Sequence, residues 1–412
     1  MLIFRLCTGT SFCAIPFVVS ISRLCSASFA ESISREPKQA GVLIVHRARV
    51  VPIDVPPWVW SESHFLLSFG SGLARQSDGT LVGVTDRGPI VGNECEVGQL
   101  CDSTRYGIKG FRPLLVSFQK SEQGDRYEVI RTLPIGGGSK GSSTSVGKRK
   151  QEECSQLRRD PEGVSVDASG TLWIVDEATS SLLALDPETG EVTKSFSPGN
   201  GLPKILNDLS EGRGFEGLSV DSDGALWIAL QSPLEPHHGE MERASVVRFV
   251  KVAPETSQVE MYAYPLSHIP PQNRNEVKIS ALEALSDKRL LFIERNVSNG
   301  EEQNFITVVS VDGVQPLKQR KKRKNEIESA KNVSKFQGSF VKTLSRTPLS
   351  TEWCDGMHKF EGVIFYEEDG EILLVEDTDF GVSEEAPCGE RVVQSSKLCI
   401  LSVSFASGSS EL

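Results

Sequence analysis

The stretch FEGLSVDSDGALWIAL, which runs from Phe215 to Leu230, decides the fold because its pattern recurs along the chain. It joins an alternating run, a turn at Asp223-Gly224 and a second run that is almost entirely apolar. Alternation with a period of two predicts a strand with one buried face, and an Asp-Gly pair between two such runs predicts a tight turn. The stretch therefore predicts a β-hairpin.

Four other stretches repeat this pattern. The first runs of the five copies begin at Ser71, Glu162, Glu216, Ser280 and Glu361. The Glu162 and Glu216 copies share the same glutamate-to-glycine spacing, whereas the fourth copy is degenerate and the fifth has an inserted residue before its glycine. Further strand-like runs follow each hairpin. Each repeat is therefore predicted to contain four strands.

Four-stranded units repeated radially, with Gly and Asp at the turns, are typical of a β-propeller. The sequence predicts an all-β fold, a single β-propeller of four-stranded blades, with five blades detectable and a sixth possible within residues 100–156. No linker separates the repeats, so residues 41–405 are predicted to form one domain. Strand-like runs at 42–45 and 397–403 flank the repeats and are expected to pair and close the ring.

Composition excludes two classes of protein. The net charge of −11 argues against a nucleic-acid binder, whose affinity would come from a basic surface. No apolar run is long enough to span a bilayer, so no membrane span is expected. The sequence does not indicate an oligomeric state.

Residues 1–30 have the features of a targeting segment. They carry Arg5 and Arg23, an apolar centre over 12–21 and a Ser28-Phe29-Ala30 end before Glu31. This order predicts a signal peptide and a secreted protein. Pro16 and the content of Arg and Ser leave an organellar transit peptide as the alternative.

Six cysteines remain after this leader: Cys95, Cys101, Cys154, Cys354, Cys388 and Cys399. An even number in a secreted chain predicts disulfide bonds, and Cys95 with Cys101 closes the shortest loop. Cys388 with Cys399 and Cys154 with Cys354 are further pairings among the fifteen that six cysteines allow; unpaired buried thiols are the alternative. The sequons at Asn296 and Asn332 predict a glycoprotein if the chain is secreted.

The hairpins place polar residues at one edge of the predicted ring. In a hairpin, the start of the first strand and the end of the second lie at the same edge. The first strands begin with Ser71, Glu162, Glu216, Ser280 and Glu361, and the second strands end with Asp86, Glu177, Gln231, Arg295 and Asp377. If the first strands line the axis, these side chains form a polar ring at one mouth of a channel.

Facing glutamates raise each other's pKa unless a cation is present, and rings of oxygen atoms suit calcium. The predicted metal ligands are Glu162, Glu216, Glu361, Asp86, Glu177 and Asp377. The competing interpretation is structural, because residues at the start of an inner strand often hydrogen-bond the backbone of the next blade.

Several motifs at these positions are shared with a known family. They include Thr85-Asp86-Arg87-Gly88, Asp160-Pro161-Glu162-Gly163, Arg213-Gly214-Phe215-Glu216-Gly217-Leu218, Tyr262-Ala263-Tyr264-Pro265-Leu266, Ile293-Glu294-Arg295 and Phe360-Glu361-Gly362. Over about residues 65–405 the chain resembles the phytase-like family, described as having esterase-like activity of phytase. The resemblance implies a small-molecule phosphate ester or carboxylic ester as substrate, and it implies no particular catalytic residues.

The chain contains no Arg-His-Gly run of the kind that histidine-dependent acid phosphatases use. Any hydrolysis is therefore expected to be metal-assisted, with calcium held by the acidic ring. Arg87, Arg213 and Arg295 are the candidates for binding the substrate anion, since a guanidinium matches phosphate bidentately. The alternative is a non-catalytic extracellular propeller that binds a ligand or a protein at the same mouth.

Overall fold

The computed structural model describes residues 43–56, 68–87, 112–136, 159–209, 212–234, 246–298, 301–317, 338–378 and 397–406. All of them belong to one compact unit, Gln39–Leu412. The predicted leader at 1–30, the pair Cys95 and Cys101, and the sequon at Asn332 lie outside the described residues. Where the structure is described, its regular elements are β-strands and short 3-10 helices.

The strands form four sheets. The eight-stranded sheet has the order β19 (Phe360–Tyr366), β20 (Glu371–Glu376), β21 (Lys397–Phe405), β1 (Leu43–Asp54), β5 (Tyr127–Pro134), β4 (Leu114–Lys120), β3 (Leu81–Val84) and β2 (Gly72–Arg75). The five-stranded sheet has the order β10 (Gly201–Leu202), β9 (Val192–Pro198), β8 (Ser181–Leu185), β7 (Leu172–Asp176) and β6 (Pro161–Val166).

The other two sheets have four strands each and are simple meanders. One contains β11 (Phe215–Val220), β12 (Leu226–Leu230), β13 (Val246–Ala253) and β14 (Gln258–Pro265). The other contains β15 (Lys278–Leu285), β16 (Arg289–Ser298), β17 (Glu301–Ser310) and β18 (Lys342–Leu349). The short helices are η1 (Lys204–Asp208), η2 (Pro271–Glu276) and η4 (Thr351–Cys354).

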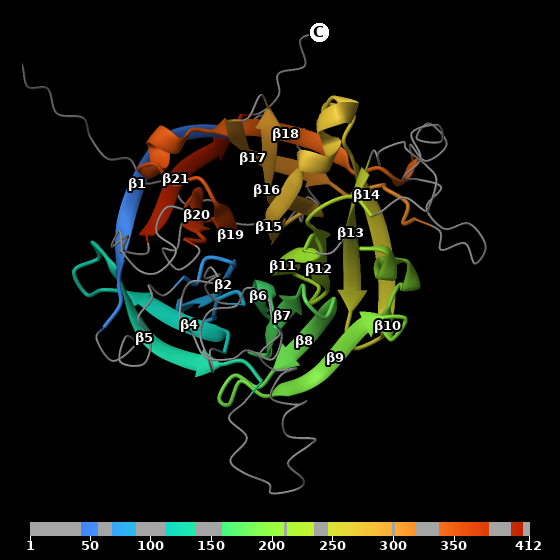
Figure 1. Ribbon diagram of the computed structural model, residues 1–412. Coiled ribbons are helices and arrows are strands. Elements are labelled where there is room, and N and C mark those ends of the chain that lie inside the picture. Colours follow the sequence, from blue (N-terminus) through green and yellow to red (C-terminus); the bar gives the residue numbers. More distant parts are fainter. Residues whose placement is uncertain are drawn as a thin grey trace, which may run out of the picture. The chain divides into compact units, whose positions relative to one another are not determined.

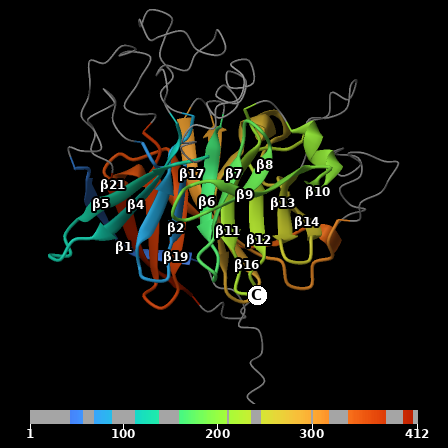
Figure 2. The ribbon, with the colours of Figure 1, turned by 90° about the horizontal axis from the view of Figure 1, so that it is seen from below.

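The sheets are arranged as a ring with the first strand of each repeat at its centre (Figure 1). These first strands contact one another in cyclic order, from β2 through β6, β11 and β15 to β19, and β19 in turn contacts β2. Figure 2 shows the same unit from the side, with the strands running between the two edges of the ring. The predicted all-β, propeller-like fold is therefore confirmed.

The ring is closed by the two ends of the domain. Strand β1 pairs antiparallel with β21 from Leu43 opposite Phe405 to Pro52 opposite Lys397. The end of β1 then pairs parallel with β5, which joins the sheets of the last and first repeats. The predicted pairing of the terminal strands is confirmed, although β1 is much longer than the 42–45 run suggested.

The range 100–156, where a sixth unit was possible, contributes β4 and β5 among its described residues. These strands pair with each other, and β4 pairs with β3. They are therefore the outer strands of the first repeat and do not form a hairpin of a separate unit.

The recurring Asp and Trp of the repeat stabilise its turn. The carboxylate of Asp221 accepts hydrogen bonds from the backbone N–H groups of Asp223 and Ala225, at 3.0 and 2.9 Å. Its second oxygen accepts one from Trp227 Nε1 at 2.9 Å, which ties the turn to the apolar second strand. Asp167 and Trp173 repeat this bond at 2.8 Å in the preceding unit. The motif therefore encodes a hairpin that is fixed by its own side chains.

The glycine after each glutamate allows the first strands to approach closely. A Cβ atom on Gly163 would lie 2.4 Å from the carbonyl oxygen of Glu216, and one on Gly217 would lie 2.5 Å from Leu282 Cβ. The cavity enclosed between these strands measures only about 10 Å³, which is about the volume that one water molecule requires. Within the described residues, the space between the inner strands is therefore narrow, because these strands pack closely against one another.

A disulfide joins Cys354 of η4 to Cys399 of β21, with a Cα–Cα distance of 5.3 Å. The pairings of Cys388 with Cys399 and of Cys154 with Cys354 are therefore wrong. The reason is three-dimensional: η4 contacts β21 although the two cysteines are 45 residues apart.

Candidate functional site

The predicted polar edge exists as a group of carboxylates around the starts of the inner strands. Glu162 on β6, Glu216 on β11 and Glu361 on β19 are all buried. Burial and then the charges of Glu216 and Asp160 raise the pKa of Glu162 well above its ordinary value. Burial and then the charge of Glu361 do the same to the pKa of Glu216. The structure therefore brings the three repeated glutamates together, as the sequence predicts.

The tightest group of oxygen atoms comes from Asp160, Glu162 and Glu177, whose carboxylate oxygens lie within 4.8 Å of one another. Asp160 was missing from the predicted ligands. It stands directly before β6 and two residues before Glu162, so it lies at the same edge as the start of that strand. This spacing in Asp160-Pro161-Glu162 is the sequence signal that points to it.

The first and third of these carboxylates are held in place by neighbouring groups. Asp160 accepts hydrogen bonds from Arg87 Nη1 at 2.5 Å and from the Arg87 backbone N–H at 3.2 Å. Glu177 accepts a hydrogen bond from the backbone N–H of Gly214 in the third repeat at 2.5 Å. Burial raises the pKa of Glu177 even though this bond opposes the shift. The cluster is thus built at the junction of the first three repeats.

Glu216 differs from the other members because one of its oxygens is unsatisfied. Its Oε2 atom is buried and has no hydrogen-bond partner among the described residues. The residue as a whole is only 2% exposed. A buried carboxylate oxygen without a donor is costly, so it needs a proton, a water molecule or a cation.

Glu361 and Asp377, in contrast, already have cationic partners. Arg295 Nη1 lies 3.2 Å from Glu361 Oε1, and Lys359 Nζ lies 3.7 Å from the same atom. Lys359 also forms an ion pair with Asp377, which accepts a further hydrogen bond from Ser68 Oγ at 2.5 Å. These two carboxylates are therefore neutralised by the protein itself.

The predicted anion-binding arginines lie at the same edge, and Arg87 and Arg295 pair with carboxylates. Arg87 binds Asp160, and Arg295 binds Glu361 and, at 2.9 Å, Glu302. Arg213 Nη1 donates to Ser232 Oγ at 3.4 Å. Their role in binding a substrate anion remains a prediction.

The two serines at the repeat position have another role. Ser280 Oγ donates a 2.6 Å hydrogen bond to the carbonyl oxygen of Phe360 in the next repeat. This is the structural contact that was the competing interpretation for the whole ring, and it is confirmed for Ser280. Ser71 Oγ is buried without a partner among the described residues. At this position of the repeat, Ser280 therefore makes a structural contact to the next repeat, whereas the glutamates act on one another through their charges.

Carboxylates gather at this edge. They are those of Asp86, Asp160, Glu162, Glu177, Glu216, Glu361 and Asp377, and Asp86 acts on Glu162 through its charge. Among the described residues, the cationic groups that act on them include Arg87, Lys278, Arg295 and Lys359. Buried carboxylates at this density favour a divalent cation, or protons in its absence.

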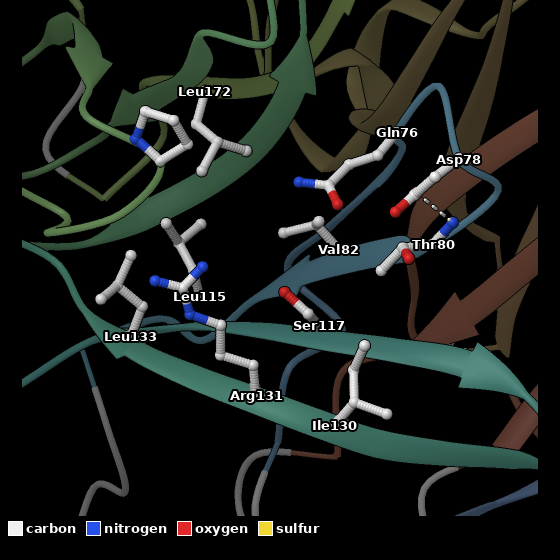
Figure 3. Close-up of a pocket in the computed structure, with 11 residues that line it drawn as sticks. Gln76, Asp78, Thr80, Val82, Leu115, Ser117, Ile130, Arg131, Leu133 and Leu172 are labelled. Atoms are coloured by element: carbon white, nitrogen blue, oxygen red, sulfur yellow. Dashed lines mark hydrogen bonds between the residues drawn. The ribbon is translucent and has the colours of Figure 1, made fainter.

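A larger cavity, of about 150 Å³, lies elsewhere, between the sheet of the first repeat and β7 (Figure 3). Its lining includes Asp78 and Thr80, which belong to the turn at the opposite end of the first hairpin from the acidic edge. Leu115, Leu133 and Leu172 form much of its apolar wall. The cavity is therefore separate from the acidic cluster.

The fold and the site define an all-β, propeller-like protein with an acidic cluster at one edge of its ring. A family profile described as phytase-like, with esterase-like activity of phytase, matches residues 68–380. The chain belongs to this phytase-like family. No curated protein sequence gave a match.

Solved structures give distant similarities. A gluconolactonase from Xanthomonas campestris is 10% identical, with 89% of this chain and 98% of that chain covered and a TM-score of 0.32. A luciferin-regenerating enzyme is 12% identical, with 88% and 98% covered and a TM-score of 0.38. A virginiamycin B lyase from Staphylococcus aureus is 9% identical, with 86% and 99% covered and a TM-score of 0.32.

Among the described residues, no helix is both long and apolar enough to cross a membrane.

The predicted sequon at Asn296 lies within the described residues. The side chain of Asn296 is buried, and its Nδ2 atom donates a 2.8 Å hydrogen bond to Glu294. A glycan would have to be attached to this same atom, so the fold opposes glycosylation at Asn296.

Proposed function

We propose that this protein is a metal-assisted hydrolase of phosphate or carboxylic esters that acts at the acidic edge. Membership of the phytase-like family supports an ester of a small molecule as the substrate. The observation that carries the proposal is the cluster of Asp160, Glu162 and Glu177, beside which Glu216 holds a buried oxygen without a donor.

The residues fit a hard cation. All four side chains offer carboxylate oxygens, which are the ligands that calcium prefers, and the cluster contains neither histidine nor cysteine. Asp160, Glu162 and Glu177 would hold the ion, with Glu216 next to them. Glu361 and Asp377 lie outside this group of three and pair with Arg295 and Lys359.

A bound divalent cation supplies Lewis-acid polarisation of an ester oxygen and orients water. The chain contributes the preorganisation. Arg87 fixes the orientation of Asp160, and the Gly214 N–H fixes that of Glu177, so neither carboxylate has to be ordered when the ion arrives. Arg87, Arg213 and Arg295 remain the candidates for the substrate anion, and Arg213 Nη1 donates to Ser232 Oγ at the same edge.

A turnover assay tests this function. Hydrolysis of p-nitrophenyl phosphate and p-nitrophenyl acetate is measured with millimolar calcium and with chelator. We expect calcium-dependent hydrolysis that Glu162→Gln abolishes, and no effect of Glu188→Gln, which changes an exposed carboxylate paired with Arg131. Hydrolysis that is unaffected by both chelator and Glu162→Gln would contradict the proposal.

A non-catalytic propeller that binds a ligand or protein through a bound cation is the second candidate. It is favoured by one observation: among the described residues, the pocket between the inner strands measures only about 10 Å³, too small for an ester substrate to enter there. Calcium binding without turnover of any ester would select this candidate.

The number of blades, the bounds of the domain and the localisation are part of the same proposal. We infer five blades, which is supported by the closed cycle of contacts among the five first strands. Residues 41–405 form the propeller domain.

Secretion after removal of residues 1–30 is supported by the Cys354–Cys399 disulfide, since such bonds persist in oxidising compartments. An organellar destination is the alternative, and the location and N-terminal sequence of the mature chain decide between them.

A further inference from the structure

A second polar cluster lies between the third and fourth repeats and is centred on Glu294, which is fully buried. Its Oε2 accepts a hydrogen bond from Tyr264 Oη at 2.6 Å. Its Oε1 accepts from His268 Nε2 at 3.1 Å, Asn296 Nδ2 at 2.8 Å and Arg346 Nη2 at 2.9 Å. Two of the motifs shared with the phytase-like family, Ala-Tyr-Pro-Leu and Ile-Glu-Arg, thus meet in one hydrogen-bond network, and this network is separate from the cluster of Asp160, Glu162 and Glu177.

These donors keep Glu294 ionised. Burial alone would raise its pKa, but the hydrogen bond from His268 and the charge of Arg346 lower the pKa to about 2. Arg346 is itself fixed, because its guanidinium stacks 3.3 Å from the ring centre of Phe305. A permanent, well-oriented carboxylate therefore lies behind His268.

The carboxylate determines the tautomer of His268. An ionised carboxylate only accepts hydrogen bonds, so Nε2 must carry the proton that His268 donates to Glu294. In the neutral ring, Nδ1 then keeps its lone pair. No described residue hydrogen-bonds Nδ1, and the side chain is 30% exposed. His268 thus presents a basic nitrogen on the side away from Glu294.

The segment that carries His268 lies at the acidic edge. It connects the end of β14 to the start of β15, and both of these strand ends are at that edge. Arg274 Nε donates to the carbonyl oxygens of Leu266 and Ile269, at 3.2 Å each, which fixes the turn around His268. The segment ends at Lys278, whose charge opposes the rise that burial causes in the pKa values of Glu177 and Glu216.

The two clusters are also joined through β16. Glu294 and Arg295 are consecutive, so their side chains point to opposite faces of the strand. Glu294 faces the third repeat and binds His268, while Arg295 faces the fifth repeat and binds Glu361. The His268–Glu294 pair and the Arg295–Glu361 pair therefore lie on opposite faces of β16.

We propose that His268 is the proton-accepting residue of the ester hydrolysis, with Glu294 and Tyr264 as its positioning residues. This proposal rests on the proposed function. A water molecule transfers a proton to His268 Nδ1 as its oxygen forms a bond to the phosphorus or carbonyl carbon of the ester. The bond to the alkoxy oxygen then breaks, and the leaving alkoxide takes the proton from the imidazolium and becomes the alcohol. Ester and water are consumed, and acid and alcohol are formed, so the step is balanced.

The kinetic test is His268→Gln, because glutamine retains a donor for Glu294 but is not a base. We expect kcat to fall by about 10²-fold or more, with the calcium-induced rise in melting temperature unchanged. The control is His46→Gln, which changes an exposed histidine on β1 and should leave kcat unchanged. Undiminished kcat in His268→Gln, in an enzyme that turns over, overturns the proposal while the proposed function stands.

Two further readouts separate a basic role from a structural one. Among the described residues, His268 contacts Glu294 and Tyr264, Arg346 binds the same Glu294 carboxylate, and Arg274 binds the backbone on either side of His268; Glu276 stands at the end of the same segment. Glu294→Gln removes the negative charge of Glu294, so the acidic limb of the kcat/KM profile should move to lower pH; an unmoved limb contradicts the proposal. Nitrogen NMR of the unmutated protein should show the proton on Nε2, and a proton on Nδ1 overturns it. Absence of turnover in the unmutated enzyme refutes the proposed function, and the role of His268 with it.

Discussion

Glu283 provides a stability test that depends on the fold alone. It lies on β15 between two neighbouring repeats and accepts hydrogen bonds from Ser219 Oγ at 2.9 Å and from the backbone N–H of Phe365. Burial raises the pKa of Glu283 to about 7 although both bonds oppose the shift, and the charge of Glu367 adds to the increase. The folded protein therefore keeps a proton on Glu283 up to about neutral pH.

The direction in which stability changes with pH follows from the number of protons that Glu283 binds in the folded and unfolded states. In the unfolded chain Glu283 titrates near its ordinary value of 4.5, whereas in the folded chain it titrates near 7. Between these values the folded state binds more protons, so the free energy of unfolding falls as pH rises through this window. The interval corresponds to about 3 kcal/mol, since each pKa unit is worth about 1.4 kcal/mol.

Glu283→Gln removes this titration and keeps a side chain of similar size. Urea unfolding at pH 4 and pH 8 measures the difference. We expect the unmutated protein to lose about 3 kcal/mol more stability than the variant over this range. Glu188→Gln, at an exposed position, serves as the control and should follow the unmutated protein. Identical pH dependence in Glu283→Gln and the unmutated protein would refute the argument.

Three other predictions concern packing, covalent structure and ion binding. Gly163→Ala should destabilise the protein by about 1–3 kcal/mol in urea unfolding, because its Cβ would clash with the Glu216 carbonyl, whereas Gly338→Ala, which has open space around it, should be nearly neutral. Reduction of the Cys354–Cys399 bond should lower stability by about 4 kcal/mol in the chain-entropy model, and an unchanged melting temperature in reductant would count against it. Calcium affinity measured by calorimetry should weaken as pH falls, because protons compete for the acidic cluster; a pH-independent affinity would be inconsistent with that competition.

The hairpins and the acidic edge could be predicted from sequence because both depend on short-range spacing. Asp221, Gly224 and Trp227 determine a turn within one hairpin, and the start and end of a hairpin must share an edge. Repetition of Glu162 and Glu216 at one position of this hairpin was then enough to bring them together.

Contacts between distant parts of the chain could not be predicted in this way. The Cys354–Cys399 pair depends on how η4 lies against β21, and nothing in the local sequence indicates that contact. The pairing of Arg295 with Glu361 depends on the packing of the fourth repeat against the fifth. The Glu294 network likewise joins strands of two repeats, so its role with His268 is visible only in three dimensions.

The central claim is that the acidic edge binds a cation. At one hundred times its dissociation constant a ligand adds about 2.7 kcal/mol to stability, which corresponds to a rise of several degrees in melting temperature. Glu216→Gln removes the carboxylate whose oxygen lacks a donor, so it should diminish or abolish that rise.

The most direct measurement is therefore the melting temperature in chelator and in millimolar calcium, for the unmutated protein and for Glu216→Gln. We expect a calcium-dependent increase of several degrees in the unmutated protein and little or none in Glu216→Gln. Equal melting temperatures of the unmutated protein in chelator and in calcium would contradict the account and leave the glutamates as structural residues.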